Sequence, residues 1–171
     1  MDNSFFVYLQ QLELMAFFSG YPLLYAVIFS IAGNQRSGTS IKGRLVSLLP
    51  FAYALVGTLF LGLQLKNLYP DYSLGNIKQA LAQPYLVIWG FLSLFFWIPA
   101  LAQKPVLSLL HSLVFFFFLV RDLVLQLFAA SPDNTIVKNE MKIYTDSLFL
   151  NMGAFVCIVI LSFLLTYFKK R

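Results

Sequence analysis

PVLSLLHSLVFFFFLVRDLVLQLF, residues Pro105 to Phe128, is the stretch that decides the fold. At about 1.5 Å per residue, a helix of this length reaches about 36 Å, enough to cross the roughly 30 Å hydrocarbon core of a bilayer. The same stretch carries the chain's one histidine, His111, and the adjacent charges Arg121 and Asp122. It therefore predicts a transmembrane helix that holds polar groups at membrane depth.

The composition extends this interpretation to the whole chain. Of 171 residues, 60% are hydrophobic and only 11% are charged, with a mean hydropathy of +0.78. Soluble domains are about 45–50% apolar and about 25% charged, so water cannot be the solvent for this much apolar surface. Runs such as residues 91–98 are apolar on every side, without the period of two of a membrane strand. We expect an all-α integral membrane protein with a single domain over residues 1–171.

Five apolar runs predict a five-helix bundle. The expected spans are residues 12–33, 45–65, 84–102, 105–128 and 146–168. The first run leaves two interpretations open: residues 4–18 either lie at the membrane interface or continue the span, which would then kink at Pro22. Between the third and fourth spans, Gln103–Lys104 allows only a tight turn, so these spans should form an antiparallel hairpin, the third bending at Pro99.

The distribution of basic residues predicts the orientation. With five spans and the N-terminus outside, the inner segments hold Arg36, Lys42, Arg44, Lys104, Lys169, Lys170 and Arg171, and the outer segments hold Lys66, Lys78, Lys138 and Lys142. Cytoplasmic loops carry the excess of Lys and Arg, which makes the C-terminus cytoplasmic. We expect a multi-pass protein of the cell inner (plasma) membrane. The net charge of +5 follows from this rule, so no nucleic-acid partner is implied.

Arg121 and Asp122 predict a polar cluster in the outer third of the membrane. Ionisable residues inside a span are costly and are usually paired. Adjacent residues on a helix point about 100° apart, so these two need other partners or Arg121 must extend to the headgroups. The candidates at similar depth are Asn151, Gln64 and Glu13. The cluster either locks the bundle together or forms a functional site, and the first role is favoured.

His111 marks a candidate proton or ligand site. It lies on one face of its helix with Asp122, and Ser108 and Ser112 are near enough to hydrogen-bond its ring. Phenylalanines between His111 and Asp122 interrupt any proton path. A neutral, hydrogen-bonded histidine is therefore the favoured interpretation.

Small residues predict one close helix contact. Ala54, Thr58 and Gly62 repeat every four residues, a spacing that lets two helix backbones approach each other. The single cysteine, Cys157, excludes an intramolecular disulfide. One histidine and one remote cysteine cannot supply a zinc site, and we expect no metal or cofactor.

These features favour a function by association. No catalytic motif is present, the loops are short and the helices are apolar on broad faces. We expect a non-enzymatic subunit or accessory factor of a larger membrane complex, whose partners are the lipid bilayer and other membrane proteins or further copies of the chain. The alternative is a small oligomeric channel or transporter that uses Arg121, Asp122 and His111.

Overall fold

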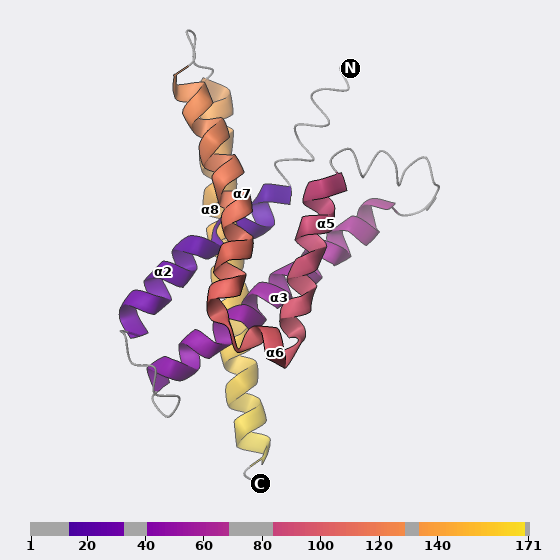
Figure 1. Ribbon diagram of the computed structural model, residues 1–171, viewed down its shortest axis with the longest axis vertical. Coiled ribbons are helices and arrows are strands. Elements are labelled where there is room, and N and C mark those ends of the chain that lie inside the picture. Colours follow the sequence, from indigo (N-terminus) through magenta and orange to yellow (C-terminus); the bar gives the residue numbers. More distant parts are fainter. Residues whose placement is uncertain (1–13, 33–40, 69–83, 129–133, 170–171) are drawn as a thin grey trace.

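The computed structural model describes residues 14–32, 41–68, 84–128 and 134–169 (Figure 1). Within these ranges the chain is helical and contains no strand. Residues 14–18 form a helical segment that turns at Ser19–Gly20 into the next helix. The elements that follow are α2 (Tyr21–Ala32), α3 (Ile41–Leu68), α5 (Pro84–Leu92), the 3₁₀ helix η1 (Ser93–Trp97), α6 (Pro99–Ala102), α7 (Pro105–Leu127) and α8 (Asn134–Lys169).

Four helical stretches are long and apolar enough to cross a membrane. They are Leu14–Ile31, Gly43–Lys66, Pro105–Leu125 and Met141–Lys169. Tyr85–Trp97 is a fifth apolar helical stretch, but it is shorter. These stretches correspond to the five predicted apolar runs, and they indicate a multi-pass membrane protein.

The third predicted span is interrupted. Its helix changes to 3₁₀ geometry at Ser93 and ends at Ile98, whose backbone is extended with φ −74° and ψ 121°. The cause is Pro99, because a proline disfavours helical geometry in the residue before it. The predicted bend at Pro99 is thus confirmed, as are the turn at Gln103–Lys104 and the helix start at Pro105.

The last helix extends beyond the predicted span. Residues 146–168 lie within α8, which begins at Asn134 and runs for 36 residues. The prediction followed the apolar run alone, and the first turns of α8 are polar. A polar sequence forms a helix as readily as an apolar one when it lies outside the hydrocarbon core.

The helix ends gather in two groups (Figure 1). One end of the molecule holds the end of α2, the start of α3, the α6 turn and the end of α8. The opposite end holds the end of α3, the start of α5, the end of α7 and the start of α8. The helices cross obliquely, so α3 passes across α8 near its middle and across α7 near the start of α7.

The core lies at this crossing and is rich in aromatic rings. Phe18 stacks on Phe115 with ring centroids 4.6 Å apart and meets Phe60 edge-on at 5.4 Å. Gly90 lets α5 approach Phe60 of α3 closely, because a Cβ at position 90 would lie 2.8 Å from the Phe60 ring. Apolar side chains are also exposed along α7 and α8, as expected for surfaces that face lipid.

Candidate functional site

His111 lies inside a cage of aromatic side chains. The Tyr53 hydroxyl is 2.7 Å from the His111 Nδ1 atom. The Trp89 ring stacks on the imidazole at 4.8 Å with an interplanar angle of 5°, and its Nε1–H donates to the His111 carbonyl at 3.1 Å. Phe96 and Phe115 contact the ring from other directions. α3, α5, η1 and α7 therefore fix one imidazole in one orientation.

The two ring nitrogens of His111 have different surroundings. Nδ1 either accepts a hydrogen bond from Tyr53 or donates one to it, depending on the tautomer. Nε2 is buried and has no hydrogen-bond partner among the described residues. The ring therefore has one polar contact and an otherwise apolar environment. This geometry holds the side chain in place.

A second hydroxyl pair lies beside this cage. The Tyr21 hydroxyl is 2.8 Å from Ser108 Oγ, and Ser108 Oγ donates to the Pro105 carbonyl at 2.7 Å. The rings of Tyr21 and Tyr53 pack with centroids 4.5 Å apart, which joins the two pairs into one buried unit. We call Tyr21, Tyr53, Trp89, Ser108 and His111 the His111 cluster.

The two predicted serines contribute in a different way than expected. The Ser112 hydroxyl donates to the Leu109 carbonyl of its own helix at 2.8 Å. Ser108 also bonds its own helix and reaches the cluster through Tyr21 rather than through the imidazole. The structure therefore brings Ser108 and His111 into one cluster, and Ser112 lies buried beside them.

Tyr21, Tyr53 and Trp89 were not predicted from the sequence as members of this site. A signal was present at Tyr53, which lies in the middle of an apolar run rather than near a membrane interface. Interfacial tyrosines extend their hydroxyl to water, whereas a tyrosine at mid-span needs an internal partner. The one mid-membrane imidazole was the partner to consider.

Asn151 holds the break between residues 14–18 and α2. Its Nδ2 atom donates to the Phe17 carbonyl at 2.9 Å and to the Ser147 carbonyl at 2.8 Å. The Gly20 N–H donates to Ser147 Oγ at 2.8 Å. A break in a helix frees backbone groups that lipid cannot satisfy. The side chains of Ser147 and Asn151 satisfy two of them, so this helix break is pinned to α8.

Asn151 is therefore not the hydrogen-bond partner of Asp122 that was predicted. Phe116 packs against Tyr144, which sets the register of α7 against the antiparallel α8. Asp122, six residues beyond Phe116, is level with residue 138, and Asn151 lies about 20 Å farther along α8. Asp122 itself is half-buried and interacts electrostatically with Arg121.

Arg121 lies on the outer surface of α7. Its side chain is exposed. Phe117, Val124 and Leu125, one turn away on the same face, are exposed as well. Of the other residues predicted for this cluster, Gln64 is half-buried on α3 and Glu13 lies outside the described residues. The structure thus gives Arg121 an apolar surface instead of an internal cluster.

The predicted packing stripe does not act as a unit. Ala54 is buried in the core, but Thr58 is exposed and nothing lies within 4 Å of a Cβ placed at Gly62. The close contact on α3 occurs at Gly57, where a Cβ would collide with Ser93 Oγ. Thr58 donates to the Ala54 carbonyl at 3.0 Å and accepts from Trp97 Nε1 at 3.0 Å.

Comparison with models of known protein families, with curated proteins and with solved structures gave no match to this chain. The class of the protein therefore rests on its helices. They indicate a multi-pass α-helical membrane protein with a buried polar cluster around one histidine.

Proposed function

We propose that this chain is a non-enzymatic subunit or accessory factor of a larger membrane protein assembly. The observation that carries the proposal is Arg121, an exposed cation within an apolar face of α7. Charged side chains within spans usually face the interior of a bundle or pair with another group. Asp122 interacts with Arg121 electrostatically, and a neighbouring transmembrane helix with an acidic or polar side chain would provide a further group.

The surroundings of Arg121 give this partner a defined position. Phe117 is 65% exposed and Leu125 is 57% exposed, one turn before and one turn after Arg121. A helix packed along this face would cover both apolar side chains and meet the guanidinium between them. Extension of the side chain to the headgroups is the competing explanation, because Arg121 is four residues from the end of the apolar stretch at Leu125.

Native purification tests the proposal. The wild-type chain, extracted in mild detergent and analysed by native mass spectrometry, should carry a membrane protein in fixed stoichiometry. Arg121→Leu should reduce the amount of partner at least tenfold, while Arg121→Lys and the control Lys66→Leu retain it. A monomer without partners would contradict the proposal, and so would a partner that Arg121→Leu binds equally well.

We infer five crossings, with the basic end of the molecule in the cytoplasm of a cell bounded by an inner membrane. α5 and η1 together reach about 24 Å, counting about 1.5 Å per α-helical and 2.0 Å per 3₁₀ residue, which is close to the thickness of a thin bilayer core. The described basic residues lie at both ends, with Arg44, Lys104 and Lys169 at the end that holds the α6 turn and Lys66, Lys138 and Lys142 at the opposite end. The orientation therefore rests on the sequence, in which seven Lys and Arg belong to the inner segments and four to the outer ones, a bias typical of a cytoplasmic face.

A channel or transporter is the second candidate. It would need a path between His111 and Arg121, which are about 15 Å apart along α7. Phe115 is fully buried between them, and Leu119 is nearly so. Because this packing disfavours a polar path, we rank transport second, and a self-oligomer with solute-dependent thermal shifts would favour it.

A further inference from the structure

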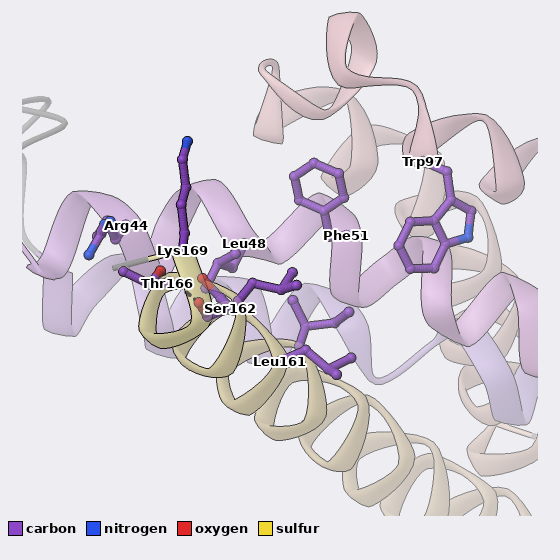
Figure 2. A pocket seen from close by; sticks show the side chains of 10 residues that line it. Arg44, Leu48, Phe51, Trp97, Leu161, Ser162, Thr166 and Lys169 are labelled. Carbon is purple, nitrogen blue, oxygen red and sulfur yellow. Dashed lines mark hydrogen bonds between the residues drawn. The ribbon is translucent and has the colours of Figure 1, made fainter. Parts of the chain in front are cut away.

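A groove of about 590 Å³ opens between α3 and α8 at the basic end of the molecule (Figure 2). Its volume lies in the range of about 300–1,000 Å³ that is typical of ligand sites. The groove is lined by one face of each helix and by the end of η1: Arg44, Leu48, Phe51, Trp97, Ile158, Leu161, Ser162, Leu165, Thr166 and Lys169. It is separate from the His111 cluster, with which it shares no residue.

The lining changes from charged to apolar along the groove. Arg44, Thr166 and Lys169 lie toward one end in Figure 2, and Phe51 and Trp97 lie toward the other. Both cations are exposed, and none of the described lining residues is acidic. Such a surface is complementary to a molecule with an anionic head and an apolar tail.

The apolar end has fixed walls. Trp97 is held by the hydrogen bond from its Nε1 atom to Thr58, and its ring lies 6.2 Å from that of Phe51. Ile158 also lines the groove and is buried, whereas Leu161 and Leu165 are half or more exposed. An apolar chain placed here would cover these leucines.

The charged end is also suited to an anion. Arg44 is in the first turn of α3, which contains no acidic residue. A helix N-terminus favours negative charge, so a cation there adds nothing to helix stability. An anion at this point would interact favourably with the guanidinium, with the helix dipole of α3 and with Lys169.

The dimensions of the groove correspond to one membrane leaflet. From Lys169 to Ile158 the groove follows α8 for eleven residues, about 16 Å. One leaflet makes up about half of the roughly 30 Å hydrocarbon core. We propose that the groove binds one anionic phospholipid of the cytoplasmic leaflet, with its phosphate between Arg44 and Lys169 and an acyl chain along α8 toward Trp97. Basic pockets between transmembrane helices on the cytoplasmic side bind anionic lipid headgroups in this manner.

Native mass spectrometry of the full chain in detergent tests this assignment. Phosphatidylglycerol should bind the wild-type protein more tightly than phosphatidylcholine with the same acyl chains. In Arg44→Gln/Lys169→Gln, phosphatidylglycerol should bind about twenty-five-fold more weakly, taking about fivefold for each cation near a lipid surface. The matched control is Lys66→Gln/Lys142→Gln, which removes the same charge from the same two helices outside the groove and should bind like wild type.

A second variant tests the apolar part of the groove. Ser162→Phe puts a ring into the space and keeps both cations, so it should also weaken phosphatidylglycerol binding, and circular dichroism would verify that the variants keep their helical content. Equal binding of the two lipids, or wild-type affinity in Arg44→Gln/Lys169→Gln, would overturn the proposal. Complete displacement of phosphatidylglycerol by inorganic phosphate would overturn it too, since it would assign the site to the free anion.

Discussion

At the scale of single residues, the hydrogen bond between Tyr53 and His111 is the main polar contact of the buried cluster. Both side chains belong to apolar helices, and each supplies the other's hydrogen-bond partner at 2.7 Å. Removal of one partner leaves the other unsatisfied in a medium without water, whereas removal of both leaves only a packing change. The pair is therefore suited to a double-mutant cycle.

We expect Tyr53→Phe and His111→Phe each to lower the free energy of unfolding by about 1–3 kcal/mol. The double variant should lose less than the sum of the two, with a coupling energy of about 1 kcal/mol or more. Unfolding in mixed micelles, followed by circular dichroism, gives all four values. Additive losses would show that the hydrogen bond contributes nothing to stability.

The sequence predicted His111 and Ser108 as members of one site, but it could not predict what surrounds them. Ser108 and His111 are one turn apart on a single helix, so their spacing in the sequence was sufficient to predict that they lie close together. Tyr21 and Tyr53 reach the site from other helices, and their distance from His111 depends on helix crossing angles that no local pattern encodes. The same limit applies to Asn151, whose carbonyl partner Phe17 is 134 positions away.

At the scale of helical elements, the break at Ser19–Gly20 depends on its contact with α8. A Cβ on Gly20 would collide with backbone atoms of Ser147 and Leu148, so α8 approaches here as closely as glycine permits. In contrast, nothing lies within 4 Å of a Cβ placed on Gly153, on α8 itself. The two glycines form a matched pair for substitution.

Gly20→Ala should destabilise the protein by about 1–3 kcal/mol, because the two segments must separate to admit the methyl group. Gly153→Ala should leave stability unchanged or raise it by up to about 1 kcal/mol, since alanine favours a helix more than glycine does. Thermal unfolding in detergent would compare them. Equal effects from both substitutions would contradict the close contact of Gly20 with α8.

Asn151→Leu tests the same joint from the other side. The substitution leaves the Phe17 carbonyl without its donor in a buried site, and we expect a loss of about 1–2 kcal/mol in the free energy of unfolding. Asn151→Asp keeps the size of the side chain but removes the donor, so it should be no more stable than Asn151→Leu. A fully stable Asn151→Leu would show that the bend forms without this hydrogen bond.

Element boundaries were predictable where proline or a short connection determined them. Pro99 and Pro105 set the bend and the start of α7, and both positions were confirmed. The start of α8 was not predictable from hydropathy, because the first turns of α8 are polar. Hydropathy identifies the part of a helix that lies in the membrane, but not the part that extends beyond it. The 3₁₀ geometry of η1 was likewise not predictable, because a run of apolar residues does not distinguish a 3₁₀ helix from an α-helix.

At the scale of the whole molecule, the orientation of each helix end depends on the number of membrane crossings. The four long apolar helices support a multi-pass protein, and the charge distribution supports five crossings with a cytoplasmic C-terminus. If α5 and η1 did not cross, the end of α3 and the α6 turn would lie on the same side of the membrane. The α7–α8 hairpin and the C-terminus would then be reversed as well.

The most direct test is to label single cysteines in cells with a membrane-impermeant maleimide. Cys157 is exposed on α8 and would first be replaced by Ser. Lys66→Cys and Lys138→Cys should then react in intact cells, whereas Gln103→Cys and Lys169→Cys should react only after the membrane is permeabilised. Reaction of Lys66→Cys and Gln103→Cys from the same side would contradict the five-crossing topology and the cytoplasmic position of the groove.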